Sequence, residues 1–198
     1  MRPAGSSLIL IILLVAGNAW AGTVERCQGQ AQEVRRAHAY YFGVDFPSEY
    51  AVGQRQQESN CRDVLSRDGV GSEGPAQITY RLWQTPLQRQ GITEIRTPEN
   101  HAKAQAFINR AAWRQAEHKR LWVMFQIYNG GGLVNKEITR AGKADWKAAY
   151  SVCKRRMITF KDGSKINACD INYDYSKRVY RYGEQYRVLG PSTSYPFW

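Results

Sequence analysis

The first part of the chain alternates between helical runs and polar breaks. Over residues 24–42 the apolar side chains recur three or four positions apart, which predicts a helix, and Gly43 is a typical stop. A second helix is expected to open near Asp45 and Pro47, because Asp is a good N-cap and Pro fits a first turn. It would end at about Glu58, which therefore lies at a predicted helix carboxyl end.

The next region should change from a loop back to helices. Residues 66–73 are polar and rich in glycine, which predicts a loop or a short ribbon, and residues 76–88 have a helix-compatible pattern. Thr97 and Pro98 then give a strong start signal, since Thr suits the N-cap and Pro the first turn. From there we expect one long helix or a broken pair that continues through Ala112.

The most apolar stretch outside the amino terminus covers residues 121–127. It is apolar on nearly every side, which predicts a buried central helix, and residues 128–131 should end it because Asn and Gly adopt left-handed conformations. A helix over 145–156, a hairpin over 157–167 and a closing helix over 171–186 complete the pattern. The predicted fold is mainly α (α+β), with several helices around a buried central helix and a small β-hairpin element.

The amino terminus has the features of an export signal. Arg2 precedes an apolar run over residues 8–16, and a small-x-small pattern follows that ends at Ala21. We therefore expect residues 1–21 to be a signal peptide cleaved after Ala21, which places the protein in the periplasm or cell envelope. The apolar run is too short for a stable membrane-spanning helix, and an uncleaved signal anchor is the alternative.

The mature chain is expected to be one monomeric domain. Residues 22–190 contain no repeat, low-complexity tract or long linker, and residues 191–198 form a short C-terminal tail. The whole chain has a net charge of +11, which falls to +10 without Arg2. A basic protein attracts polyanions, and export favours cell-wall polymers over nucleic acid as the partner.

Four cysteines predict disulfides rather than a metal site. An even number of cysteines in an exported chain favours oxidation, and three pairings of the four are possible. We favour Cys27 with Cys61 and Cys153 with Cys169, because each pair would clip a local unit. The sequence has no Cys-x-x-Cys and no His near a cysteine, so we expect neither a metal nor another cofactor.

Several short motifs follow one another in an informative order. They are Glu58-Ser59, Ser66 with Gly69, Gly74 with Gln77, and Tyr128-Asn129-Gly130-Gly131. This order resembles the lytic transglycosylases of the lysozyme superfamily, whose pattern is Glu-Ser, a Ser-containing loop closing on Gly-Leu-Met-Gln, and later Tyr-Asn-Ala-Gly. The resemblance extends over roughly residues 40–187, but Pro75-Ala76 stands where the family has Leu-Met, and the loop before it is about two residues longer.

The resemblance implies a lysozyme-like domain that cleaves peptidoglycan without water. Glu58 would be the single catalytic residue, first as acid and then as base, and the product would carry a 1,6-anhydro-muramic acid end. Ser66, Gln77, Tyr128 and Asn129 match positions that line the glycan cleft. Tyr128 would direct its phenol at Glu58 or the sugar, or else be one more buried aromatic with a backbone partner, and Asn129 should also shape the turn.

Glu58 can act as an acid near neutral pH only if its pKa is raised. The negative end of its own helix and a partly apolar cleft wall would both raise that pKa. The alternative is a solvated glutamate paired with Arg55 or Arg62. Next to the acid, Ser59 is expected to brace the loop.

Other functions stay open at this level. A goose-type-like peptidoglycan hydrolase, or lysozyme, would need a second carboxylate, for which Asp63, Asp68 and Glu73 are the candidates. A non-catalytic wall-binding protein, or one that serves a secretion, conjugation or phage apparatus, would keep the cleft without turnover. The basic, aromatic segment 173–187 would suit nucleic acid, but its tyrosines recur at helical spacing and should mostly face the core.

Overall fold

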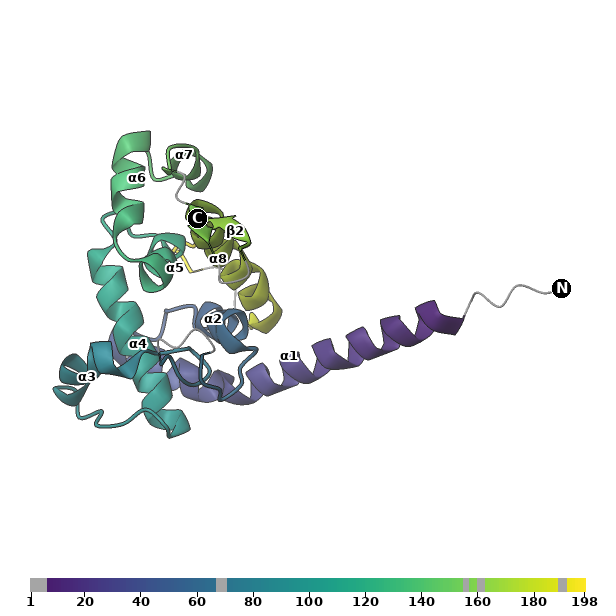
Figure 1. Ribbon diagram of the computed structural model, residues 1–198. Coiled ribbons are helices and arrows are strands. Elements are labelled where there is room, and N and C mark those ends of the chain that lie inside the picture. The colour runs from purple at the N-terminus through teal and green to yellow at the C-terminus, as the bar shows by residue number, and fades with distance from the viewer. Residues whose placement is uncertain (1–6, 67–70, 155–156, 160–162, 189–191) are drawn as a thin grey trace.

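Helices make up most of this protein in its computed structural model, which describes residues 7–66, 71–154, 157–159, 163–188 and 192–198 (Figure 1). The helices are α1 (Ser7–Phe42), α2 (Glu49–Ser59), α3 (Tyr80–Gln88), α4 (Pro98–Gln115), α5 (Leu121–Gly130), α6 (Leu133–Ala141), α7 (Trp146–Ser151) and α8 (Ala168–Gly183), followed by a 3₁₀ turn, η1 (Glu184–Tyr186). Strands β1 (Met157–Thr159) and β2 (Lys165–Asn167) pair as an antiparallel hairpin. The predicted class, mainly α with a small hairpin, is confirmed.

Helix α5 is the buried centre of the larger core. All seven residues of 121–127 are buried, as their apolar pattern predicted, and they pack with residues of α1, α2, α4, α6 and α8. The first N–H groups of a helix have no partner within the helix, and burial here would leave them unsatisfied. The carbonyls of Pro196 and Phe197 accept hydrogen bonds from the N–H groups of Leu121 and Trp122, at 3.0 and 3.1 Å. The end of the chain therefore docks on the domain and caps its central helix.

Helices α2 and α8 cross at two glycines. A Cβ atom on Gly53 would lie 2.5 Å from the backbone nitrogen of Gly183, and one on Gly183 would lie 2.3 Å from the side chain of Tyr50. Only glycine permits so close a backbone approach. The crossing holds the two helices together along their length, so that side chains of α8 reach the carboxyl end of α2.

A buried polar network fixes α2 from the other side. The guanidinium of Arg55 donates to the side-chain oxygens of Gln105 and Gln30, at 2.7 and 2.8 Å. Gln105 in turn donates to the carbonyl of Ala51 and to Gln54, each at 2.9 Å. Because these groups come from α1, α2 and α4, the bonds link all three helices and satisfy polar atoms that burial would otherwise penalise.

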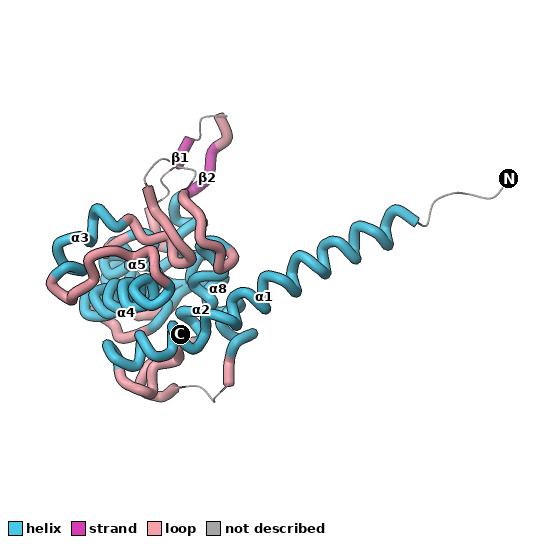
Figure 2. Tube along the Cα trace, turned by 90° about the horizontal axis from the view of Figure 1, so that it is seen from below, coloured by secondary structure: helices cyan, strands magenta, loops and turns pink. Residues whose placement is uncertain are grey.

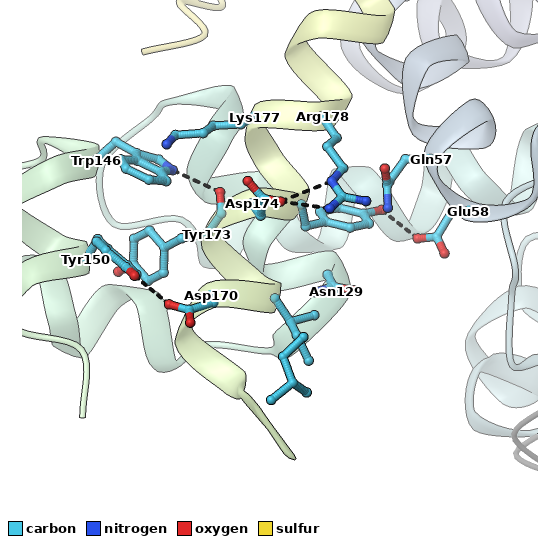
Figure 3. Close-up of a pocket in the computed structure, with 13 residues that line it drawn as sticks. Gln57, Glu58, Asn129, Trp146, Tyr150, Asp170, Tyr173, Asp174, Lys177 and Arg178 are labelled. Carbon is cyan, nitrogen blue, oxygen red and sulfur yellow. Dashed lines mark hydrogen bonds and ion pairs between the residues drawn. The ribbon is translucent and has the colours of Figure 1, made fainter. Parts of the chain in front are cut away.

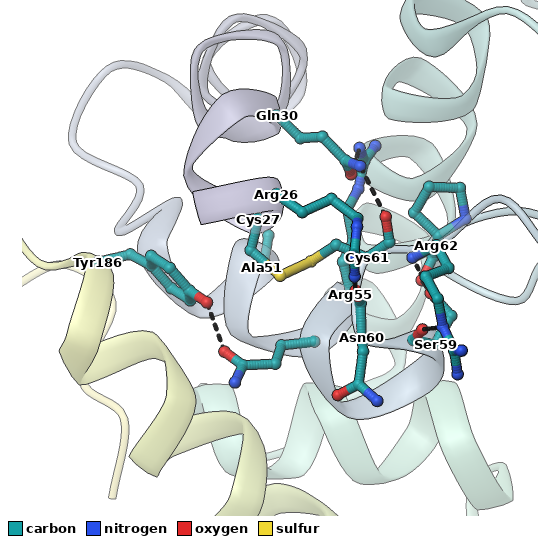
Figure 4. Close-up of a disulfide and its surroundings, with 12 residues drawn as sticks. Arg26, Cys27, Gln30, Ala51, Arg55, Ser59, Asn60, Cys61, Arg62 and Tyr186 are labelled. Atoms are coloured by element: carbon teal, nitrogen blue, oxygen red, sulfur yellow. Dashed lines mark hydrogen bonds between the residues drawn. A yellow bond between two sulfur atoms is a disulfide. The ribbon is translucent and has the colours of Figure 1, made fainter. Parts of the chain in front are cut away.

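Two disulfides close the fold, with the favoured pairing of the four cysteines. Cys27 of α1 is bonded to Cys61, two residues after α2, with the Cα atoms 5.3 Å apart (Figure 4). Cys153, two residues after α7, is bonded to Cys169 in the first turn of α8, with the Cα atoms 6.1 Å apart. Two disulfides are compatible with an oxidising, exported location.

The long first helix, α1, extends well beyond the packed helices at its amino end (Figures 1 and 2). Its carboxyl end at Phe42 agrees with the stop predicted at Gly43, whose backbone has a φ of 98°. Among the described residues, no helix is both long and apolar enough to cross a membrane. Cleavage after Ala21 stays a prediction.

The start of α2 differs from the prediction. The helix begins at Glu49 behind Ser48, whereas Asp45 and Pro47 lie in a turn before it. The cause is Phe46, which is buried and stacks on the ring of His38 with the centroids 5.0 Å apart. Burying this ring requires the turn, and the N-cap therefore moves three residues along the chain.

Three other segments agree only in part with their predicted bounds. Helix α3 begins at Tyr80 rather than near 76, because the backbone of Ile78 pairs with Glu73 in an isolated bridge. The ribbon expected over 66–73 is present at its ends, where the backbone of Ser66 donates to the carbonyl of Ser72 at 2.7 Å, whereas residues 67–70 lie outside the described chain. Helix α7, predicted over 145–156, begins at Trp146 behind the N-cap Asp145 and ends at Ser151, just before the Cys153 disulfide.

Candidate functional site

A cavity of about 460 Å³ opens where the end of α2 faces α7, β2 and α8 (Figure 3). Its lining combines carboxylates, cations and aromatic rings, and includes Glu58, Trp146, Asp170, Asp174, Lys177 and Arg178. Such a mixture of apolar surface and a few convergent polar groups is typical of a binding site.

Glu58 occupies the last turn of α2, as predicted. The helix stops because Asn60 and Cys61 adopt left-handed conformations, with φ of 55° and 58°. Their N–H groups donate back to the carbonyls of Gln56 and Arg55, at 3.0 and 3.1 Å, which satisfies the last turn. This tight ending leaves the side chain of Glu58 half-buried at the cavity wall.

The hydroxyl of Tyr175 donates a hydrogen bond of 2.5 Å to the carboxyl of Glu58. Burial raises the pKa of Glu58 from 4.5 to about 7, although the bond from Tyr175 favours the charged form and acts in the opposite direction. A carboxyl with a pKa near neutrality can deliver a proton at physiological pH. Glu58 has this property because burial outweighs the opposing effect of the Tyr175 hydrogen bond on its pKa.

The alternative of an ion-paired glutamate is not what the structure contains. Within the described part of the chain, no Lys or Arg forms an ion pair with Glu58. Arg55 turns away toward Gln30 and Gln105, and the Nε atom of Arg62 donates to the carbonyl of Ser59 at 3.0 Å.

Tyr128 has a different partner. Its hydroxyl donates to the carbonyl of Ala76 at 2.7 Å, so of the two alternatives for this phenol the backbone contact is the one observed. Burial raises the pKa of Tyr128, and the charge of Glu58 contributes in the same direction. Tyr175, which the sequence pattern assigned only to the packed face of the closing helix, makes the contact with Glu58 instead.

The loop before α3 is tied to the end of α2. The hydroxyl of Ser59 donates to the carbonyl of Pro75 at 2.9 Å and accepts from the N–H of Arg62 at 3.0 Å, so Ser59 braces the loop as expected. Gln77, with a φ of 50°, donates through its side chain to two loop carbonyls at 2.9 Å each. The hydroxyl of Ser66 accepts from the N–H of Ser72 at 3.1 Å, which stabilises the ribbon.

A second cavity of about 410 Å³ lies between this loop and helices α3, α4 and α5. Gln77, Tyr128 and Asn129 line it, together with Trp83, and no Asp, Glu, Lys or Arg is among its described lining residues. Asn129 also lines the Glu58 cavity, so it stands between the two. Three of the four residues predicted to line a cleft therefore face this pair of cavities, whereas Ser66 lies in the ribbon beside them.

Asn129 does not shape the turn after α5. It lies inside the helix, and its side chain donates to Asn172 of α8 at 2.7 Å. The turn is made by Gly131, which has a φ of 75°. Glycine takes this conformation at the least cost, and the asparagine is left free to link α5 to α8.

The expected second carboxylates lie elsewhere. Asp63 lines a separate small cavity, Glu73 pairs through its backbone in the ribbon, and Asp68 lies outside the described residues. The Glu58 cavity contains Asp170 and Asp174 instead, which sequence reasoning missed. Their spacing of four residues on one helix, followed by Lys177 and Arg178, is the signal that could have revealed them.

Each of these aspartates has a partner. Asp174 forms an ion pair with Arg178 at 2.8 Å, and Asp170 accepts a short hydrogen bond from the hydroxyl of Tyr150. The described residues contain no group of three His, Cys, Asp or Glu side chains suited to a metal ion.

No known family model matches the chain, and no curated protein or solved structure is detectably similar to it.

Proposed function

We propose that this protein is a peptidoglycan lytic transglycosylase with Glu58 as its catalytic acid and base. The observation that carries the proposal is the state of Glu58, a half-buried carboxyl at a cavity wall with a pKa of about 7 and a hydrogen bond from Tyr175. The order of the motifs around Glu58-Ser59, Gln77 and Tyr128-Asn129 supports the same assignment.

The proposed reaction needs one carboxyl group and no water. The protonated Glu58 gives its proton to the oxygen that links muramic acid to the next sugar, and the bond from that oxygen to the anomeric carbon breaks. The N-acetyl group of the muramic acid stabilises the positive centre. Glu58, now a carboxylate, takes the proton from the 6-hydroxyl, whose oxygen bonds to the anomeric carbon and forms the 1,6-anhydro ring.

The second cavity, called the neutral cavity because its described lining contains no charged residue, is suited to the sugar rings. Saccharides bind to apolar and aromatic surfaces edged by amide and hydroxyl groups, and this cavity offers Trp83 and Leu82 beside Gln77, Thr79 and Asn129. Because Asn129 borders both cavities, a strand in the neutral cavity would lie next to the Glu58 cavity.

A hydrolase is the second candidate, and one observation favours it. Asp170 and Asp174 line the same cavity as Glu58, and an aspartate there would be able to activate a water molecule on the opposite side of the sugar. The ion pair of Asp174 with Arg178 and the bond of Asp170 with Tyr150 weigh against this role, because both carboxylates are already engaged.

Digestion of purified peptidoglycan followed by mass spectrometry tests the proposal. We expect 1,6-anhydro-muramic acid ends, and we expect Glu58→Gln to fold normally while losing about 10²–10⁴-fold in rate, as removal of a general acid does. Asp170→Asn and Asp174→Asn are the matched controls and should keep most activity. Reducing muramic acid ends, together with an inactive Asp174→Asn, would establish the hydrolase instead.

A further inference from the structure

Trp146 is the most prominent aromatic ring of the Glu58 cavity, but both of its sides are occupied. The Nζ atom of Lys177 lies 3.7 Å from the ring centroid, and the ring of Tyr150 stacks on Trp146 with the centroids 5.5 Å apart (Figure 3). The indole N–H donates to the carbonyl of Tyr173 and to the hydroxyl of Ser176, at 3.2 Å each. A sugar therefore has no free face of Trp146 on which to stack.

The same arrangement fixes a cation at the cavity. Lysine side chains are normally mobile, and ordering one costs free energy on binding. Lys177 is already held over Trp146 by a cation–π contact, and in the described chain it forms no ion pair with a carboxylate. The nearest acid on its helix face, Asp174, is paired with Arg178. Lys177 thus presents a pre-organised charge that lacks an anion.

Further lysines lie on or beside the elements that line the cavity, whose own lining also includes the carboxylates of Asp170 and Asp174, each engaged with a partner. Lys147 of α7, Lys154 after it and Lys165 of β2 are all exposed, and none forms an ion pair within the described residues. Exposed cations near a cavity whose aspartates are already paired favour the approach of an anion. The neutral cavity on the other side of Asn129 has no charged residue in its described lining.

From this contrast we infer that the two cavities divide the substrate. The neutral cavity takes sugar rings, and the Glu58 cavity, through Lys177, takes a carboxylate of the stem peptide carried by muramic acid. The inference rests on the proposed function and specifies its substrate class as peptide-bearing rather than denuded glycan strands. Glu58 and Lys177 line the same cavity, and the stem peptide is attached to the same muramic acid whose anomeric carbon would react at Glu58. One sugar residue could therefore reach both side chains.

The test compares two forms of one substrate. Purified glycan strands that carry stem peptides, and the same strands after an amidase has removed the peptides, are digested in parallel, and kcat/KM is measured for each. The wild-type protein should prefer peptide-bearing strands by about tenfold or more, as expected for one charge-assisted contact. The preference should shrink as salt is added, since salt screens exposed charges.

Lys177→Met should reduce this preference about five- to tenfold, mainly through a higher KM for peptide-bearing strands, because methionine still covers Trp146 but carries no charge. Lys177→Arg should restore much of it. The matched control is Arg181→Met, which removes an exposed cation one turn further along α8 that contacts Tyr182. It should leave the preference unchanged.

Each outcome decides between the two proposals. Equal rates on both substrates, or a Lys177→Met variant that lowers both rates by the same factor, would overturn the division of the substrate while leaving the transglycosylase intact. If Lys177→Met kept the full preference for peptide-bearing strands, the proposed contact between Lys177 and the stem-peptide carboxylate would be wrong. Absence of cleavage on both substrates by the wild-type protein would remove the proposed function, and the inference with it.

Discussion

The two sides of the Glu58 cavity are built in different ways. The acid sits on α2, where eight of eleven residues are buried and where the glycine crossing with α8 and the Arg55 network leave little freedom. The opposite wall comes from α7, β2 and α8. The hairpin to which β2 belongs is little buried, since all three residues of β1 are exposed, Met157 by 54%. Each side has a disulfide, but the α2 side is also held by extensive packing, whereas the hairpin side has fewer buried residues besides its link between Cys153 and Cys169.

The proposed catalytic acid, Glu58, lies on the more tightly packed side, and the opposite side would contribute to substrate binding. A general acid has to be positioned within a few tenths of an ångström and kept out of water, which a packed core provides. Recognition of a variable, charged substrate tolerates more movement, and elements with few buried apolar contacts open most easily. Removing one stabilising element at a time should therefore affect the two sides unequally.

Removal of the first disulfide should have the largest effect on stability. Cys27→Ala combined with Cys61→Ala opens a link between residues 34 apart in sequence, and the chain-entropy estimate gives a loss of about 4 kcal/mol in the free energy of unfolding. Both side chains are fully buried, so the loss should be global. Chemical denaturation measures it, and a change below about 1 kcal/mol would contradict the picture of a core under this constraint.

Removal of the second disulfide should cost somewhat less stability and act mainly on the cavity wall. Its cysteines are 16 residues apart, which corresponds to about 3 kcal/mol in the same estimate. We expect Cys153→Ala with Cys169→Ala to speed amide hydrogen exchange over 146–170 and to raise KM, while exchange in α2 and α5 changes little. Equal acceleration in α2 would mean that the two regions do not differ as described.

Glu58→Gln should stabilise the protein in alkaline solution. The folded pKa of Glu58, about 7, lies above its usual 4.5, so the contribution of this carboxyl is complete below pH 4.5 and is lost as the pH rises through 7. Glutamine does not ionise, and the variant should gain about 1–2 kcal/mol over wild type between pH 5 and pH 8, after allowance for partial exposure. Thermal unfolding at both pH values measures this gain, which would be absent if Glu58 were solvated.

Tyr175→Phe should produce the smallest of these effects. Its hydroxyl favours the charged form of Glu58, so its loss should raise the pKa of the acid further. For a hydrogen bond of about 1 kcal/mol, the alkaline limb of kcat/KM should move up by about 0.5–1 pH unit. Tyr128→Phe is the control, because that hydroxyl contacts the carbonyl of Ala76, and its limb should stay in place.

Local signals in the sequence were sufficient for much of the fold. Thr97 caps α4 through a hydrogen bond to the N–H of Asn100, Asp145 caps α7, and the uniformly apolar run 121–127 forms the buried α5. Each of these features depends on residues within a few positions of one another. The position of Glu58 at a helix end is of the same kind, whereas its half-buried state depends on residues of distant helices.

The sequence by itself determined the helical class and the most apolar helix, because periodicity and capping act over short distances. It also favoured the observed cysteine pairs among three possibilities, and the resemblance of its motif order to a known family made Glu58 the candidate acid. Only the tertiary structure decided that Tyr175, 117 residues from Glu58, is its hydrogen-bond partner, and that Asp170, Asp174 and Lys177 share its cavity. Those neighbours follow from the close crossing of α2 and α8 at Gly53 and Gly183. The residues next to Gly53 and Gly183 in sequence do not indicate which distant helix will pack against each glycine.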